Sequence, residues 1–155
     1  MNGAAQNEYL VTEVMTATPQ KLHLMLVEAA IRSVLKAKKL REQNLSDQAG
    51  EAILRSQEII AQLIAGINPD PTAAVARRLA SVYNFVYRSL VQAHLQSSSK
   101  GLDDALRVLV AERETWKQAC ARFGSTQERA PQFAPHVNSY GAATNPASAG
   151  MSFEA

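Results

Sequence analysis

The 155-residue sequence contains very little cysteine and few glycines. The single cysteine, Cys120, cannot form an internal disulfide, which fits a reducing compartment such as the cytoplasm. The seven glycines are widely separated, and they form neither a G-x-G-x-x-G nor a G-x-x-x-x-G-K-[ST] loop for binding phosphate. These absences argue against a nucleotide-binding enzyme and against a small disulfide-rich scaffold.

Long hydrophobic runs and a strong excess of one charge are also missing. No apolar stretch approaches the roughly 18 residues that a membrane-spanning helix requires, so we expect no stable membrane insertion. The first residues lack the basic and apolar regions of a signal peptide, which predicts a cytoplasmic location. Sixteen Lys and Arg residues oppose 14 Asp and Glu residues, a net charge of +2 that does not indicate nucleic-acid binding.

The residues that usually carry catalysis or metal binding are sparse as well. None of His23, His94 and His136 follows a glutamate three positions earlier, as di-iron helical bundles require, and none forms a zinc spacing with Cys120. A histidine phosphotransfer domain is the sharpest enzymatic alternative, but the His-x-x-Lys-Gly motif of that family is absent at His23 and His94. We therefore predict no enzyme activity, no metal and no cofactor, and we assign Cys120 to the core.

Four amphipathic segments dominate what the sequence does contain. Thr18 followed by Pro19 predicts a helix start, because a threonine side chain can cap the first turn and proline suits the first helical position. Helical periodicity and turn residues then predict helices over about 19–43, 46–67, 71–95 and 102–123. Short connections between helices of this length favour an all-α fold, an antiparallel up-down four-helix bundle over residues 18–123.

The two ends of the chain differ from this bundle. Residues 1–17 contain Tyr9, Leu10, Val14 and Met15, which are too apolar for a solvated tail, so we expect an N-terminal strap lying on the bundle. Residues 124–155 are rich in Ser, Ala, Pro, Gly and Asn, and they predict a disordered tail because little apolar surface offsets the entropy of ordering.

The helix expected at 19–43 carries two apolar stripes where a surface helix carries one. The first contains Leu22, Met25, Leu26 and Ala29, and the second lies beside it from Leu24 to Leu35. Such a helix contacts partners on two sides. It is either the central helix of the bundle or a helix that also receives a guest.

A resemblance to a known family is carried by residues spread over all four predicted helices. They are Tyr9-Leu10, the run from Val14 to Pro19, Leu22, Met25-Leu26, Glu51-Ala52, Ile59-Ile60, the run from Leu79 to Phe85, Arg88, Leu90, Ala93, Leu106, Leu109, Arg113 and Trp116-Lys117. In these positions the sequence resembles the flagellar secretion chaperones (FliS-like) that bind flagellin. It departs from the family at Val27-Glu28, where an aromatic residue is usual, and at residues 68–71, where the usual loop is small or glycine-containing.

The resemblance implies a cytoplasmic export chaperone that binds the disordered C-terminal segment of flagellin, prevents premature polymerisation and delivers flagellin to the flagellar type III export apparatus. It implies a flagellar export gate component as a second partner and an anti-sigma factor as a further one. The alternative is a generic helical adaptor that binds an amphipathic helix of another flagellar or regulatory protein.

The expected flagellin-binding residues are apolar or amphipathic and lie on the first three predicted helices and the strap. They are Leu22, Met25 and Leu26, then Ile53, Gln57, Ile60 and Ile64, then Tyr83 and Tyr87, together with Tyr9, Leu10, Val14 and Met15 from the strap. Two alternatives stay open: Tyr83 belongs equally well to the core, and the strap either covers the guest site or caps one end of the bundle. Trp116 is assigned to the core.

Overall fold

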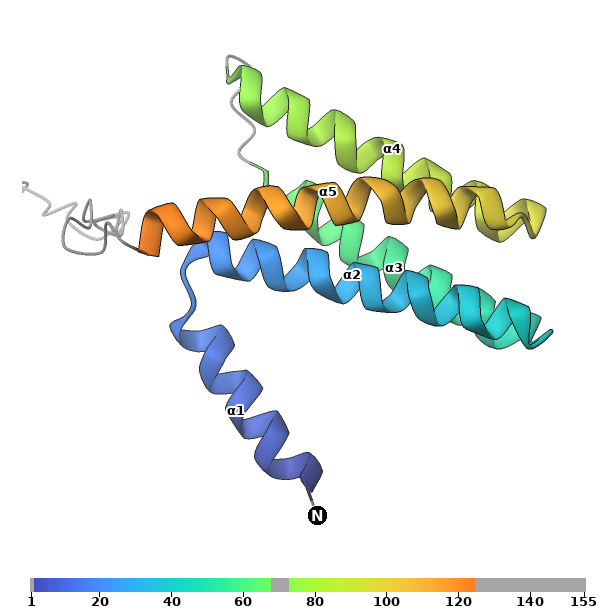
Figure 1. Ribbon diagram of the computed structural model, residues 1–155, viewed down its shortest axis with the longest axis horizontal. Coiled ribbons are helices and arrows are strands. Elements are labelled where there is room, and N and C mark those ends of the chain that lie inside the picture. The colour runs from blue at the N-terminus through green and yellow to red at the C-terminus, as the bar shows by residue number, and fades with distance from the viewer. Residues whose placement is uncertain (1, 68–72, 125–155) are drawn as a thin grey trace, which may run out of the picture.

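The computed structural model describes residues 2–67 and 73–124, and these residues form five helices (Figure 1). The helices are α1 (Asn2–Thr16), α2 (Pro19–Glu42), α3 (Ser46–Ala65), α4 (Ala74–Gln96) and α5 (Ser99–Gly124). The all-helical prediction is confirmed, although the described part of the chain has one helix more than the four predicted. Beyond Gly124, the tail predicted to be disordered lies outside the described residues.

Helices α2 to α5 enclose a single core. Helix α2 packs against α3 and α5, and α4 packs against the same two helices from the other side. Figure 1 shows that each of these helices runs opposite to the one before it. The core consists of aliphatic side chains with one aromatic ring, and the larger fully buried ones include Val27, Val34, Ile53, Ile60, Leu63, Tyr83, Leu90, Leu102 and Leu109.

The helix boundaries follow from local chemistry, with one correction to the predicted starts. Thr18 Oγ1 accepts a hydrogen bond from the backbone N–H of Lys21 at 3.2 Å, and Pro19 is the first helical residue, which confirms the predicted start of α2. Helix α3 begins at Ser46, as predicted, with Leu45 at the N-cap position and no side-chain bond there. The start predicted at residue 71 lies outside the described residues. Helix α5 begins at Ser99 rather than Leu102, two residues after the left-handed Ser97 (φ 52°) that caps the end of α4.

Helices α4 and α5 approach most closely near their connection. A Cβ atom on Gly101 would lie 2.4 Å from the carbonyl oxygen of Ser89 and 2.9 Å from Cβ of Ala93, so the two backbones meet where α5 has no side chain. The guanidinium of Arg41 donates hydrogen bonds to the carbonyl oxygens of Ala93 and Ser98. Arg41 therefore joins α2 to the last turn of α4 through Ala93 and to the connection between α4 and α5 through Ser98.

The prediction of an N-terminal strap lying on the bundle is wrong. Residues 2–16 form a helix, and Figure 1 shows α1 directed away from α2 to α5. Tyr9 and Met15 are 70% and 81% exposed. The physical reason is visible in the sequence, since Leu10, Val11, Val14 and Met15 all lie on one face of a helix, whereas an extended strap would divide them between two faces.

Replacing Gly101 by alanine should lower the free energy of unfolding by about 1–3 kcal/mol, because the new methyl group pushes α5 away from α4. The measurement is urea denaturation followed by circular dichroism. Gly66→Ala is the matched control: its Cβ would meet the nearest atom at an ordinary 3.5 Å, so stability should stay equal or rise slightly. Equal stability of both variants would show that the close approach does not exist.

Candidate functional site

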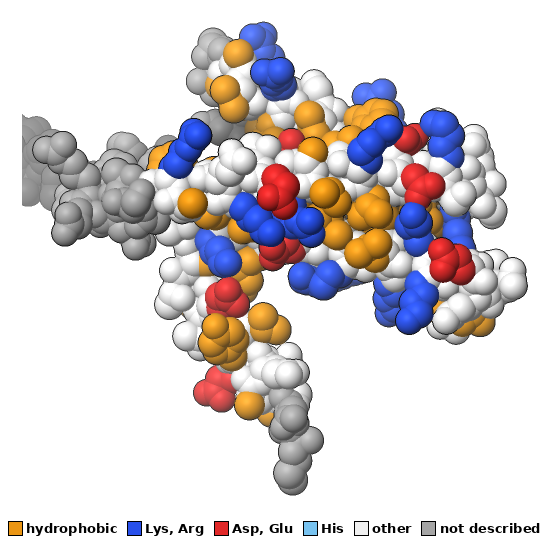
Figure 2. Space-filling view, viewed as in Figure 1, with side chains coloured by type: hydrophobic (Ala, Val, Ile, Leu, Met, Phe, Trp, Pro, Cys, Tyr) orange, Lys and Arg blue, Asp and Glu red, His pale blue; other side chains and the backbone are white. Residues whose placement is uncertain are grey.

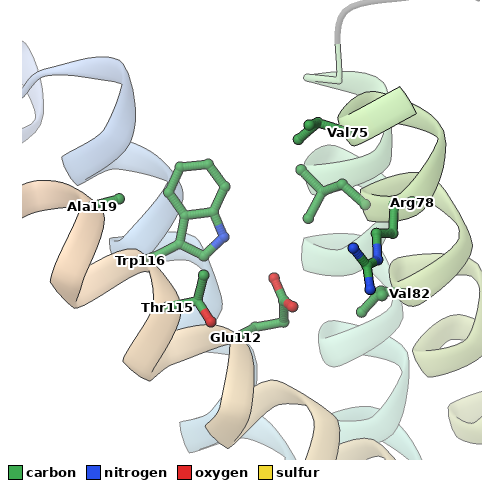
Figure 3. A pocket seen from close by; sticks show the side chains of 8 residues that line it. Val75, Arg78, Val82, Glu112, Thr115, Trp116 and Ala119 are labelled. Atoms are coloured by element: carbon green, nitrogen blue, oxygen red, sulfur yellow. The ribbon is translucent and has the colours of Figure 1, made fainter. Parts of the chain in front are cut away.

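An apolar groove of about 360 Å³ lies between the N-terminal half of α4 and the C-terminal half of α5 (Figure 3). The lining side chains are Val75, Arg78, Leu79 and Val82 from α4 with Glu112, Thr115, Trp116 and Ala119 from α5. In Figure 3 the Trp116 ring faces the aliphatic side chains of α4 across the opening. The groove is therefore suited to an apolar side chain of a guest, with Arg78 and Glu112 available for polar contacts at its edge.

A polar cluster connects this groove to α2. His23 Nε2 lies 2.5 Å from the Tyr83 hydroxyl, and that hydroxyl donates to Glu112 Oε2 at 3.4 Å. The Tyr83 oxygen must then accept the proton of His23 Nε2, which is consistent with a neutral imidazole. The His23 ring also stacks on Trp116, with ring centroids 3.8 Å apart.

Burial sets the charge states within this cluster. Burial lowers the pKa of His23 from 6.5 to about 4, so the ring is neutral at physiological pH. Burial also raises the pKa of the Tyr83 hydroxyl, and the negative charge of Glu112 raises it further. The ring that stacks on Trp116 is therefore a neutral imidazole, and the Tyr83 hydroxyl beside it is neutral as well.

The three predicted site residues on α2 lie at the surface of the α2–α3 pair. Leu22, Met25 and Leu26 are each partly buried. Leu22 and Leu26 share a helix face with Ser33, which donates a hydrogen bond to the carbonyl oxygen of Ala52 on α3 at 3.4 Å. These leucines are therefore accessible from the seam between α2 and α3.

Three other predicted site residues belong to the core. Ile53, Ile60 and Tyr83 have no exposed surface, so they offer nothing to a guest in this structure. The expectation that they line an open groove is corrected: α3 packs between α2 and α4, and its strongest apolar positions are used by those contacts. For Tyr83 the core alternative left open by the sequence is the one observed.

Gln57, Ile64 and Tyr87 are partly buried and lie on a different seam. Gln57 and Ile64 share a helix face with Gly50, where an added Cβ would lie 3.2 Å from the ring of His94 on α4. Tyr87 shares its face with His94. These three residues follow the α3–α4 seam, whereas Leu22 and Leu26 follow the α2–α3 seam, so the predicted residues do not form one groove.

The predicted residues on α1 are all exposed. Leu10, Val14 and Met15 together with Val11 form one apolar stripe along the helix, between 45% and 81% exposed. Tyr9 lies apart from this stripe and is 70% exposed. In Figure 2 the visible surface of α1 carries hydrophobic and acidic side chains away from the rest of the molecule.

Sequence reasoning missed the groove between α4 and α5. Val75, Leu79 and Val82 show helical spacing, but this pattern is equally typical of core positions. Trp116 was assigned to the core, and it does pack against the core while one side lines the groove. The sequence offered one signal for the groove, the aliphatic Val75 in the first turn of α4. In the structure Val75 is 79% exposed, so it is not needed for the core.

These features define a class of protein. The described residues contain no group of three or more metal-binding side chains and no helix long and apolar enough to cross a membrane. They do present an apolar groove and an exposed apolar helix face, which are features of a helical protein that binds other proteins.

Comparison with known proteins identifies the family. Residues 1–122 match the family model described as "Flagellar protein FliS", and the chain belongs to this family. It is 28% identical to the flagellar secretion chaperone FliS of Salmonella typhimurium over 117 residues, 75% of this chain and 87% of that protein. It is 29% identical to the protein of the same name from Bacillus subtilis over 119 residues, 75% of this chain and 88% of that protein.

A solved structure supports the fold. A crystal structure of a bacterial flagellar chaperone aligns with a TM-score of 0.64 at 20% identity, covering 79% of this chain and 99% of that one. The family is one of chaperones in flagellar biogenesis rather than enzymes, which confirms the family resemblance and the prediction of no enzyme activity.

Ile60→Asp should unfold the protein. An unpaired carboxylate in an apolar core costs several kcal/mol, comparable with the roughly 5–15 kcal/mol that stabilise a domain. Loss of the helical circular dichroism signal is the measurement. Leu54→Asp on the same helix is the control, because Leu54 is 46% exposed and should tolerate the charge. A folded Ile60→Asp variant would place Ile60 outside the core.

Stability should fall as the pH drops from about 6.5 towards 4. The unfolded chain binds a proton at His23 with a pKa near 6.5, whereas the folded protein resists protonation until about pH 4, so protonation favours unfolding within this window. The melting temperature measured across the window should decrease less steeply in His23→Gln, which keeps a donor for Tyr83 without a titrating ring. If the melting temperatures of the two proteins fell equally steeply with pH, His23 would not be held in its neutral form by the fold.

Proposed function

We propose that this protein is a cytoplasmic export chaperone that binds the disordered C-terminal segment of flagellin. The bound segment is kept from polymerising and is delivered to the flagellar type III export apparatus. In this proposal α2 to α5 serve as the antiparallel four-helix bundle expected from the sequence, and the guest folds on its surface. Apolar side chains of the guest gain partners on the chaperone and are withdrawn from filament contacts.

The observation that carries the proposal is the apolar surface left open on a chain of the FliS family. The groove between α4 and α5 holds about 360 Å³ of space beside the partly buried indole ring of Trp116. Aromatic side chains in such grooves are favoured anchors for binding. Partly buried apolar residues on the two seams of α3, such as Leu26 and Ile64, extend this surface around the bundle.

Several residues predicted from the sequence remain part of the proposed binding surface. Leu22, Leu26, Gln57, Ile64 and Tyr87 are partly buried along the seams, and Met25 is partly buried elsewhere on α2. Tyr9, Leu10, Val14 and Met15 are exposed on α1. The groove adds Val75 and Trp116 to this set. A guest that contacts all of these positions must wrap around the bundle, as a chain that folds on binding is able to do.

The partners follow from the family. The C-terminal segment of flagellin is the proposed client, and a component of the export gate is the proposed acceptor of the complex. An anti-sigma factor is a proposed further partner. The assignment to the cytoplasm belongs to the same proposal, since flagellin must be bound before it is exported.

Calorimetric titration with flagellin tests the proposal. Intact flagellin should bind one to one, and flagellin lacking its C-terminal disordered segment should not bind. Equal binding of both forms would overturn the proposal. Binding to a helix of another flagellar or regulatory protein, with none to flagellin, would identify the chain as a general helical adaptor.

Val75→Asp should weaken flagellin binding by about tenfold or more, because it places a carboxylate in the apolar groove. Val75 is 79% exposed, so the fold should be retained. Leu95→Asp is the control on the same helix, since Leu95 is 76% exposed and does not line the groove. Equal affinity of the two variants would show that the guest does not use the groove between α4 and α5.

A further inference from the structure

Two charged side chains face each other across the groove between α4 and α5. Arg78 on α4 and Glu112 on α5 are the only charged residues among the eight that line it. In Figure 3 the guanidinium and the carboxylate both point into the opening, from opposite walls. The described residues contain no ion pair that includes either of them. The groove therefore has a hydrogen-bond donor on one wall and an acceptor on the other, and the two do not satisfy each other.

The carboxylate of Glu112 is held at its wall by a buried tyrosine. The Tyr83 hydroxyl, which is in contact with His23, donates to Glu112 Oε2 at 3.4 Å. No hydrogen bond from the described residues reaches the second oxygen, Oε1. Glu112 is half-buried, so water hydrates its carboxylate less fully than it hydrates a surface carboxylate. A carboxylate in this position retains the capacity to accept a further hydrogen bond from a guest.

The two groups together favour a neutral guest side chain that both donates and accepts hydrogen bonds. A guanidinium only donates, and an ionised carboxylate only accepts. A guest lysine or arginine would be repelled by Arg78, and a guest aspartate or glutamate would be repelled by Glu112. A primary amide offers its carbonyl oxygen to Arg78 and its NH₂ group to Glu112. Because these functions lie on separate atoms, an amide reaches both walls at once.

The remaining lining residues determine what must accompany the amide. Leu79 and Val82 form an apolar wall on α4, and Trp116 forms the facing wall on α5. An aliphatic side chain of the guest fills this space and excludes water from it, which strengthens the hydrogen bonds made by the amide at the rim. The amide alone would gain little, because its own hydration must be given up on binding.

We propose that the groove recognises an asparagine or glutamine side chain of the guest, beside an aliphatic one, and that its amide bridges Arg78 and Glu112. The inference rests on the proposed function, in which the guest is the C-terminal segment of flagellin. The bridge gives the groove a selectivity that apolar contacts cannot supply. A guest leucine in place of the amide would leave both charged groups without a partner.

Calorimetric titration with the C-terminal segment of flagellin tests the proposal, with each asparagine and glutamine of the segment replaced in turn by leucine. One replacement should weaken binding to the wild-type chain about tenfold. The same replacement should leave binding to the Arg78→Leu/Glu112→Leu variant unchanged or stronger, because its groove is entirely apolar. Arg77→Leu/Glu114→Leu is the matched control. Both of its positions are exposed and lie outside the groove, so it should keep the tenfold preference.

Two single variants sharpen the test. Arg78→Leu removes the donor at an exposed position, so it should fold even if the double variant does not, and it should lose most of the preference. Arg78→Glu places two carboxylates at the rim, and it should bind the segment with lysine at the identified position more tightly than the wild-type chain does.

The outcomes separate this selectivity from the proposed function. A wild-type chain that binds every replaced segment as tightly as the unaltered one would overturn the amide bridge and leave flagellin binding intact. A preference that persists in full in Arg78→Leu would do the same. Failure of the unaltered segment to bind would overturn the proposed function, and the selectivity with it.

Discussion

The structure depends on how closely α4 approaches α5 near their connection. At that end Gly101 lies against Ser89 and Ala93, and the small side chains permit near-contact of the two backbones. At the other end Trp116 stands between the helices, with His23 stacked behind it. Because one end is held together and the other contains a large ring, the space between α4 and α5 widens into the groove. The residues that close the bundle therefore also determine where it is open.

The same arrangement explains why the polar cluster is uncharged. Tyr83 is buried and His23 is partly buried where α2, α4 and α5 meet, and a charge there would lose much of its hydration. The neutral pair fixes the position of the indole ring without placing a charge under an apolar binding surface. Glu112, at the edge of the groove, contributes the one carboxylate among the lining residues. The groove is thus an apolar surface with polar groups at its rim.

Most of the fold was predictable from the sequence, and the helix that begins at Thr18-Pro19 shows why. Its start depends on a local hydrogen bond and a fixed proline dihedral, both of which a short stretch of sequence determines. The site was less predictable, because Ile60 and Ile64 on α3 have the same period and chemistry, yet one is fully buried and the other lies on a seam. Which of them faces inward depends on how α3 is rotated between α2 and α4. The apolar residues near the N-terminus predicted a strap packed on the bundle, whereas in the structure they lie on one face of a helix, α1, that is directed away from it.

Trp116 is the only tryptophan of the chain, and it lies at the wall of the groove in contact with a histidine ring. Its emission spectrum consequently reports on a single location in the molecule. Whatever enters the groove replaces water beside the indole, which shifts the emission to shorter wavelength without any added label. The architecture thus includes an intrinsic fluorescent probe at the opening that distinguishes this bundle from a closed one.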